Sequence, residues 1–208
     1  MQFSEIVSDF FAHGFDQWND NSTGLAMVKR WVNTAYSSVC AEEDWPFLET
    51  STDQVAPYTF TDLDKILAVV AKDTTVSLEP VDRRTLERKD VDLAETGTGS
   101  YWYMEGDTLK TWPVDTATLS IRYKKLPVDM SADTDVPIIP VRFHDLIVKK
   151  ACWFAYSNRD SELYRNVSEV YEKRLQEMRE QLLVRNHDQP IVMAPNVDYY
   201  GISQILWR

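Results

Sequence analysis

The chain has 208 residues and a formal net charge of −11, and 44% of its residues are hydrophobic. This length suits one domain, or one domain with an embellishment, and the apolar content can build a core, so disorder of the whole chain is excluded. An acidic surface repels a phosphate backbone on average, which argues against sequence-specific DNA binding. A negative surface would still suit a protein that DNA must pass without binding to it.

The beginning of the sequence, MQFSEIVSDFFAHGF, has no basic segment and carries two acidic residues among its apolar ones. A secretory signal peptide is therefore not expected. No run approaches the roughly 18 apolar residues that span a bilayer. Cys40 and Cys152 both fall within apolar helical patterns and are expected to be buried free thiols. Together these features predict a soluble protein made in a reducing compartment.

Two helices are predicted in the first part of the chain. Residues 3–12 place apolar side chains at helical spacing, and Gly14 is expected to stop that helix. Residues 23–42 form a second amphipathic helix, because apolar side chains recur there at steps of three and four. Those side chains are Leu25, Val28, Val32, Ala35, Tyr36 and Val39. This helix is expected to end near Glu42, shortly before the sequence Trp45-Pro46-Phe47.

Strand signals replace the helical periodicity between about residues 47 and 126. The run KILAVVA at 65–71 is apolar and rich in β-forming residues, and residues 83–94 could hold a short charged helix. A three-stranded meander is predicted from 101–104, 109–112 and 119–124, with a turn at Glu105-Gly106-Asp107. In its last strand one face holds Leu119, Ile121 and Tyr123, and the other holds Ser120, Arg122 and Lys124. This alternation predicts a sheet with one dry face.

The sequence DMSADTDVPIIP at 129–140 is predicted to be a linker that returns the chain to helix. A helix near 141–157 follows, with Pro140 in its first turn, where a missing N–H costs nothing. Another helix is predicted near 161–187, with an apolar stripe over about five turns. The pattern thus predicts an α+β fold, mainly a helical bundle with an inserted antiparallel β-region and an extended C-terminal arm.

The predicted division of the chain has three parts: a helical body from 1–48 and 137–188, a β-rich subdomain at 49–136, and the arm at 189–208. The arm cannot continue the helix, because it contains two prolines and a glycine. Ordering its 20 residues costs about 20–40 kcal/mol, and burying its apolar side chains returns about 15–25 kcal/mol. We therefore predict that it is mobile in the monomer and ordered on assembly, by pairing with a strand edge or by burial between subunits. Packing on its own domain is the alternative.

The sequence holds no motif typical of catalysis. It lacks a P-loop and a G-x-G-x-x-G, and Gly97-Thr98-Gly99 precedes a strand rather than a helix, which is the wrong context for binding phosphate. The three histidines, His13, His144 and His187, lack metalloprotease spacing. A meeting of Cys40 with a histidine in space is disfavoured. The chain is therefore predicted not to be an enzyme, with no catalytic, cofactor-binding or metal-binding residues.

Two clusters of charge have a less specific interpretation. The carboxylates of Asp129, Asp133 and Asp135 lack the glycine and the final glutamate of an EF-hand loop, so a solvated linker is expected there. The basic residues 122, 124 and 125 on one strand are also expected to be solvated. Contact with a phosphate or with an acidic neighbour is the alternative for them.

Two stretches carry a resemblance to a known family. The helix with Arg30-Trp31-Val32-Asn33-Thr34-Ala35-Tyr36 runs into Glu43-Asp44-Trp45-Pro46-Phe47-Leu48, which resembles the opening of tailed-phage head-to-tail adaptor (head completion) proteins. The second stretch joins Tyr123-Lys124-Lys125-Leu126-Pro127, the Pro137–Pro140 loop and the helix with Phe143-His144-Asp145-Leu146-Ile147. The order helix–Trp–sheet–helix–helix is similar to that of podophage tail tubular protein A. The resemblance covers roughly residues 23–185 and rests on pattern rather than on invariant motifs.

The resemblance implies a structural virion protein in the head–tail connector, assembled in the host cytoplasm. Such proteins form a twelve-fold ring on the portal, with a helical body, a C-terminal extension toward the portal and a β-part facing the tail or the neighbouring subunit. The implied partners are copies of itself, the portal protein, a downstream stopper or tail protein, and genomic DNA that passes through the lumen without specific binding. No cofactor and no membrane are expected. The arm residues expected to contact the portal are Tyr199, Tyr200, Ile205, Leu206 and Trp207.

Three other functions compete with this interpretation. A tail-side connector, such as a stopper or tail terminator, would share the assembly logic, but those proteins are usually smaller and β-dominated, so the helix pair at 140–188 argues against it. A small metal-dependent enzyme is a more distant alternative. A cellular adaptor with an exposed hydrophobic arm, unrelated to phage, is the third.

Overall fold

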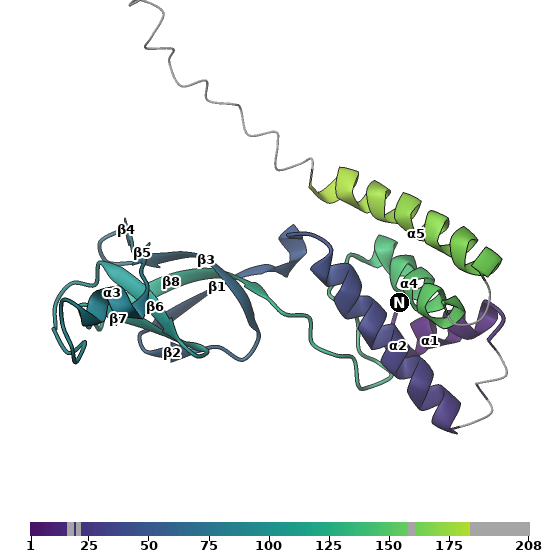
Figure 1. Ribbon diagram of the computed structural model, residues 1–208, viewed down its shortest axis with the longest axis horizontal. Coiled ribbons are helices and arrows are strands. Elements are labelled where there is room, and N and C mark those ends of the chain that lie inside the picture. The colour runs from purple at the N-terminus through teal and green to yellow at the C-terminus, as the bar shows by residue number, and fades with distance from the viewer. Residues whose placement is uncertain (16–18, 20–21, 158–160, 184–208) are drawn as a thin grey trace, which may run out of the picture.

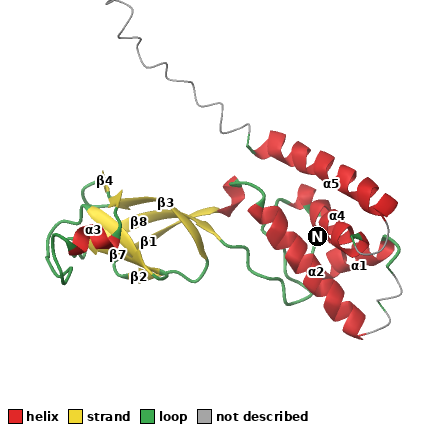
Figure 2. Ribbon diagram, viewed as in Figure 1, coloured by secondary structure: helices red, strands yellow, loops and turns green. Residues whose placement is uncertain are grey.

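The structure is a computed structural model that describes residues 1–15, 19, 22–157 and 161–183. Helices gather at one end of the molecule and strands at the other, and the chain crosses between the two ends twice (Figures 1 and 2). The predicted α+β class is confirmed. The predicted arm at 189–208, with its five proposed portal-contact residues, lies outside the described residues, as does residue His187.

Four helices make the helical part: α1 (Phe3–Ala12), α2 (Ser22–Ala41), α4 (Asp145–Tyr156) and α5 (Ser161–Leu182). Helix α4 packs against the other three, so the two sequence halves share one core. The apolar stripes predicted from the sequence face this core, because residues three and four positions apart lie on the same side of a helix. Among the side chains that are fully buried there are Phe3, Phe10, Val32, Trp45, Phe143, Ile147 and Tyr171. Gly14, with a φ of +94°, follows α1 as predicted.

The linker at 129–140 is more than a solvated connection. The backbone N–H groups of Phe3 and Ser4 donate to the carbonyl oxygens of Asp135 (2.8 Å) and Asp133 (3.1 Å), so the linker satisfies donors in the first turn of α1. The carboxylate of Asp135 in turn accepts backbone N–H groups of the linker itself. Asn33 of α2 holds the linker from the other side through both polar groups of the Met130 backbone. Asp129 and Asp133 are exposed, in agreement with the expected solvated linker, but the linker also holds the start of α1 and the middle of α2 through its backbone.

The β-part contains two four-stranded sheets. Their strands are β1 (Glu49–Val55), β2 (Tyr58–Thr59), β3 (Leu63–Ala71), β4 (Val76–Ser77), β5 (Glu79–Pro80), β6 (Tyr101–Glu105), β7 (Thr108–Trp112) and β8 (Thr118–Lys125), with the short helix α3 (Arg83–Glu87) between β5 and β6. One sheet has the order β1-β8-β3-β4 and the other β2-β7-β6-β5. All pairs are antiparallel except β5 with β6.

The predicted meander is wrong in one respect. Strands β6 and β7 form the expected hairpin around Gly106, whose φ is +60°. Strand β8, however, leaves that sheet and pairs with β1 and β3, whose residues precede their partners in β8 by about 50 to 75 positions in the chain. Turn chemistry predicts a neighbouring hairpin but not a partner far away in sequence. The core between the sheets includes Leu109 of β7 and Leu119, Ile121 and Tyr123 of β8, so the dry face of β8 is confirmed.

The last helices differ slightly from their predicted bounds. The predicted helix at 141–157 begins with the 3-10 turn η3 (Val141–Phe143) after Pro140, and α4 then starts at Asp145. Helix α5 is described to Leu182, and the remainder of the predicted 161–187 helix beyond Leu183 lies outside the described residues. Within the described part, no helix is long and apolar enough to cross a membrane.

Candidate functional site

The segment Glu42-Glu43-Asp44-Trp45, here called the junction segment, lies where α2 ends and the chain crosses into the β-part. Its first carboxylate faces the helical part. Glu42 Oε1 accepts hydrogen bonds from Lys150 Nζ of α4 at 3.1 Å and from the Tyr171 hydroxyl of α5 at 3.3 Å. Glu42 thus ties the end of α2 to both C-terminal helices.

The second carboxylate binds the same body at another point. Glu43 Oε1 accepts a hydrogen bond from Arg179 Nε of α5 at 2.9 Å. Arg179 lies in the last turn of α5, where a cation also complements the partial negative charge of the helix end. The described end of α5 is therefore held beside the junction segment.

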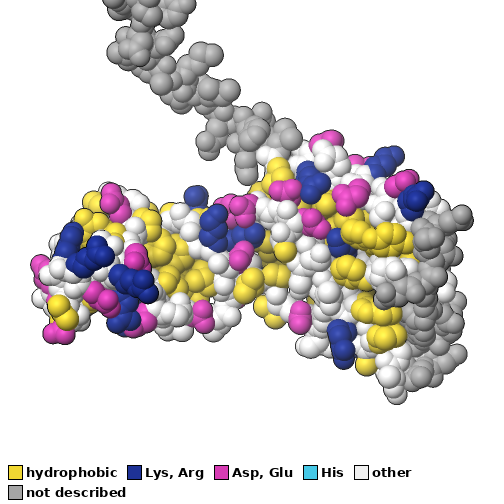
Figure 3. Space-filling model, in the orientation of Figure 1, with side chains coloured by type: hydrophobic (Ala, Val, Ile, Leu, Met, Phe, Trp, Pro, Cys, Tyr) yellow, Lys and Arg dark blue, Asp and Glu magenta, His cyan; other side chains and the backbone are white. Residues whose placement is uncertain are grey.

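The third carboxylate faces the β-part. Asp44 Oδ1 accepts a hydrogen bond from Lys124 Nζ of β8 at 3.0 Å, and Lys65 of β3 stands 3.9 Å from the other oxygen of Asp44. The Lys124 ammonium also contacts Asp64 at 3.3 Å and the carbonyl oxygen of Glu43 at 3.4 Å. Contact with an acidic neighbour was the less favoured expectation for Lys124, and the structure shows that contact. Acidic and basic side chains lie together at this narrow part of the molecule in Figure 3.

The pKa shifts at the junction follow from these contacts. Burial by itself lowers the pKa of Lys124, but the hydrogen bonds to Asp44 and Asp64 outweigh it and raise that pKa above its ordinary value. The same hydrogen bond lowers the pKa of the Asp44 carboxyl. Burial, together with the charge of Glu42, raises the pKa of the Tyr171 hydroxyl, which stays a hydrogen-bond donor. Both shifts favour the charged forms of Asp44 and Lys124, which face each other as opposite charges.

Trp45 anchors the junction segment in the helical core. Its side chain is completely buried, and its indole N–H donates to the carbonyl oxygen of Val39 at 2.9 Å. The ring stacks on Phe47 with centroids 5.9 Å apart. The chain then enters the 3-10 turn η2 (Pro46–Leu48) and continues into β1. Four consecutive side chains therefore contact α2, α4, α5, β3 and β8, so this is where the two parts of the molecule are fastened together.

The comparisons with known proteins give the family. The model of the SU10 adaptor protein family matches residues 1–197, nearly the whole chain. The chain belongs to the SU10 adaptor protein family. It is a phage adaptor protein, which implies a structural, non-enzymatic role and partners within the phage virion. No curated protein matches the chain.

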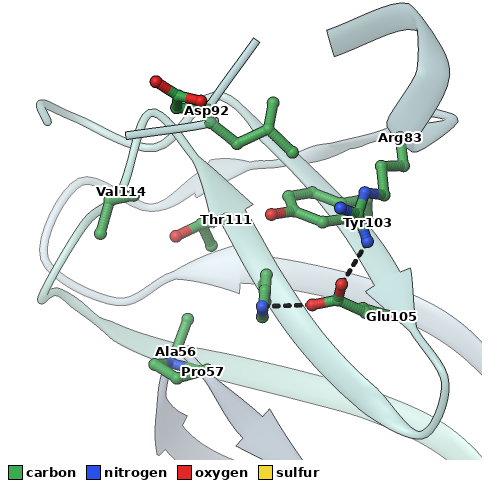
Figure 4. A pocket seen from close by; sticks show the side chains of 10 residues that line it. Ala56, Pro57, Arg83, Asp92, Tyr103, Glu105, Thr111 and Val114 are labelled. Carbon is green, nitrogen blue, oxygen red and sulfur yellow. Dashed lines mark hydrogen bonds and ion pairs between the residues drawn. The ribbon is translucent and has the colours of Figure 1, made fainter. Parts of the chain in front are cut away.

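A second feature of this adaptor is a cavity of about 280 Å³ in the β-part (Figure 4). Arg83 of α3 and Glu105 of β6 point toward one another across it, and Lys110 of β7 binds the second oxygen of the same carboxylate. Tyr103 and Leu93 supply apolar walls. Both cations, Arg83 and Lys110, are paired with carboxylates already present, so neither offers an unpaired positive charge to an anionic ligand.

His144, Cys40 and Cys152, which were the candidates for chemistry in the sequence, are all buried. His144 is buried, one ring nitrogen lies 2.7 Å from the carbonyl oxygen of Ile139, and burial lowers its pKa. Cys40 and Cys152 are buried free thiols as predicted, and burial raises the pKa of each to about 12. In the part of the chain that the structure describes, no group of three or more His, Cys, Asp or Glu side chains could hold a metal ion.

The junction segment was missed as a site by sequence reasoning, which used it only as part of a resemblance. The available signal was three consecutive acidic residues followed by a tryptophan at the end of an amphipathic helix. Such a run is ordinarily solvated. The segment has a structural role because the fold brings three basic residues to it from distant parts of the sequence: Lys124, Lys150 and Arg179.

Proposed function

We propose that copies of this adaptor form a twelve-fold ring that docks on the phage portal and gives the tail its attachment platform. The match of the SU10 adaptor protein family over residues 1–197 carries the proposal. A ring of identical subunits needs a heterologous interface, in which each copy offers two different surfaces to its neighbours. We assign these two surfaces to the helical end and to the β end of the molecule, which lie at opposite ends in Figure 1. In the virion, this ring would sit between head and tail after assembly in the host cytoplasm.

The charge of the chain supports a channel for genomic DNA through this ring. With a net charge of −11, the average surface repels phosphates, so DNA could pass without being held. The basic side chains named above, Lys124, Lys150 and Arg179, are paired with carboxylates rather than presented to a ligand. The partners on this proposal are further copies, the portal protein, and a stopper or tail protein below.

We propose that the junction segment keeps the helical body (1–48 and 137–188) and the β-rich subdomain (49–136) at a fixed angle. A ring between head and tail must transmit force from one partner to the other, and ion pairs that link both parts oppose bending. Each of the three carboxylates has a partner on an element distant in sequence, and Trp45 is anchored in the core.

The C-terminal arm, 189–208, is proposed to reach the portal. The side chains proposed for this contact are Tyr199, Tyr200, Ile205, Leu206 and Trp207. Aromatic side chains dominate the binding energy of many interfaces, since they bury a large apolar area at low entropic cost.

The experiment is to mix the purified adaptor with purified portal and to image the mixture by negative stain. Rings on portals are expected with the full chain. Deletion of 190–208 is expected to abolish docking and to leave the helical circular dichroism intact. The control is Val91→Ser, at an exposed site in the β-part, which is expected to change neither docking nor the circular dichroism. Unchanged docking of the deletion variant would remove the arm from the mechanism. Absence of rings with the full chain would overturn the proposed function.

A further inference from the structure

Strand β1 is the one long edge strand among the described strands. It lies at the end of the sheet ordered β1-β8-β3-β4, and its seven residues, Glu49–Val55, pair with β8 on one side only. The other three sheet ends are strands of two residues, β2, β4 and β5. A strand of two residues offers little backbone for pairing, whereas a long edge presents a row of N–H and C=O groups to any extended chain nearby.

Apart from the charged residues Glu49 and Asp53, the devices that normally protect an edge are missing from β1. It contains no proline, glycine or lysine. Its pairing with β8 runs without a register shift from Glu49 to Val55, while the pairing of β3 with β8 has two shifts. Prolines, lysines and bulges are what keep edges from adding another strand. The free edge of β1 can therefore pair with an added strand along its length, unlike the other three edges, which are strands of two residues.

The end of α5 lies close to the base of β1. Arg179 of α5 bonds Glu43, and Glu43 stands six positions before the first residue of β1. Beyond Leu183 the first apolar run is Ile191-Val192-Met193-Ala194, which opens with two β-branched residues and lies between Pro190 and Pro195. Proline cannot donate to a strand ladder, so these two prolines delimit a run of four residues that can pair. Seven residues lie between Leu183 and Ile191, and the eight steps from one to the other can extend about 26 Å.

We propose that β1 receives residues 191–194 of a second copy of this chain as an added strand. The inference rests on the ring proposed above, because a donor arm and an acceptor edge on one chain form a heterologous pair that can close a ring. Main-chain hydrogen bonds supply the affinity in this mode of binding. The arm would pass over the neighbouring copy first, and residues from Tyr199 onward would stay available to the portal.

Cysteine cross-linking tests this pairing. Ser51→Cys places a thiol on the exposed face of β1, and Val192→Cys places one on the arm. The two single variants are mixed, assembled with portal and oxidised. A disulfide-linked dimer that needs both variants is the expected result, because facing side chains on paired strands have Cβ atoms about 4.5–5.5 Å apart. Cys40 and Cys152 are buried and should not interfere.

The matched control replaces Ser51→Cys with Val91→Cys, whose side chain is 82% exposed in the β-part but is not on β1. No dimer is expected from that mixture. Rings on portals without the Ser51–Val192 dimer would overturn the inference and leave the proposed function standing. A disulfide within one chain of the Ser51→Cys/Val192→Cys variant, with no dimer, would also overturn it, since the donor would then be the same copy.

A proline substitution gives a second, independent measurement. Val192→Pro removes a donor in the middle of the run and is expected to reduce the yield of rings about tenfold. Val197→Pro, outside the run, is expected to change that yield little. Equal ring yields for the two variants would contradict strand addition by residues 191–194. Failure of the unmodified chain to form rings overturns the proposed function and, with it, this inference.

Discussion

The helical part and the β-part of the molecule are held together in different ways. The helical part has one continuous apolar core to which α1, α2, α4, α5 and Trp45 contribute. The β-part divides its apolar residues between a core that lies between the two sheets and a smaller cluster around Leu86, Tyr103 and Trp112. Since stabilisation grows with buried apolar area, the helical part should be the more stable of the two.

The ionic contacts of the two parts also differ, since those of the helical part are more deeply buried. In the helical part Lys150 is only 5% exposed and lies 4.1 Å from the centroid of the Trp153 ring. In the β-part Arg83, Glu105 and Lys110 form ion pairs at the surface, where solvent weakens them. We therefore expect that loss of a junction contact lowers the stability of both parts, whereas loss of a surface ion pair in the β-part changes the stability of either part little.

The largest expected effect comes from removing the anchor that the two parts share. Trp45→Ala deletes a completely buried side chain and its hydrogen bond to Val39, so it is expected to lower the free energy of unfolding by about 3–5 kcal/mol. Urea denaturation monitored by circular dichroism measures this. Trp102→Ala, at a partly buried position of β6, is the matched control and should cost less. Equal costs would contradict the role assigned to Trp45.

The next prediction tests whether one part can be destabilised without the other. Leu109 is completely buried in the β-part, and Leu109→Ala is expected to cost about 2–4 kcal/mol. Amide hydrogen exchange should then show faster exchange in β6, β7 and β8 with little change in α2 and α4. Ile147→Ala, at a completely buried site of α4, is the counterpart and should speed exchange in the helices. Uniform loss of protection from either change would mean that the molecule unfolds as one unit.

The same contrast explains how far the sequence could predict the structure. The bounds of α1 were predicted correctly and those of α2 to within one residue, because helical periodicity is a local signal in the chain. The β6–β7 hairpin was also local, through the turn at Gly106. The placement of β8 between β1 and β3 was not predictable, since it depends on partners far away in sequence. The junction contacts of Lys124 and Lys150 were missed for the same reason.

A double-mutant cycle at Glu42 and Lys150 should give an intermediate effect. Glu42→Ala leaves the nearly buried Lys150 without its carboxylate and is expected to cost about 2 kcal/mol, reduced from the value for a fully buried pair because Glu42 is partly exposed. Lys150→Met keeps an apolar stem against Trp153 and Tyr171. The double variant Glu42→Ala/Lys150→Met should therefore be more stable than Glu42→Ala alone. Additive costs in urea denaturation would show that the two groups do not interact.

The smallest effect concerns the link to the β-part and depends on pH. Lys124→Met removes the partner of Asp44 and Asp64, and because both carboxylates are solvent-exposed the expected cost near neutral pH is about 1 kcal/mol. The control is Arg122→Met, which changes an exposed cation on the same strand. Thermal unfolding at a series of pH values measures both variants against the unmodified chain.

The sign of the pH dependence follows from the two shifted groups. The pKa of Asp44 is lower in the folded protein, so its contribution to stability is complete above the ordinary carboxyl pKa of about 4 and is lost as the pH falls below it. The pKa of Lys124 is higher in the folded protein, so its contribution is present below about 10.4 and is lost as the pH rises through the folded pKa. The stability difference between the unmodified chain and Lys124→Met should therefore be greatest between these limits and shrink in acid and in strong base. A difference that stays constant from acid to base would show that Lys124 stabilises the junction through its apolar stem rather than its charge.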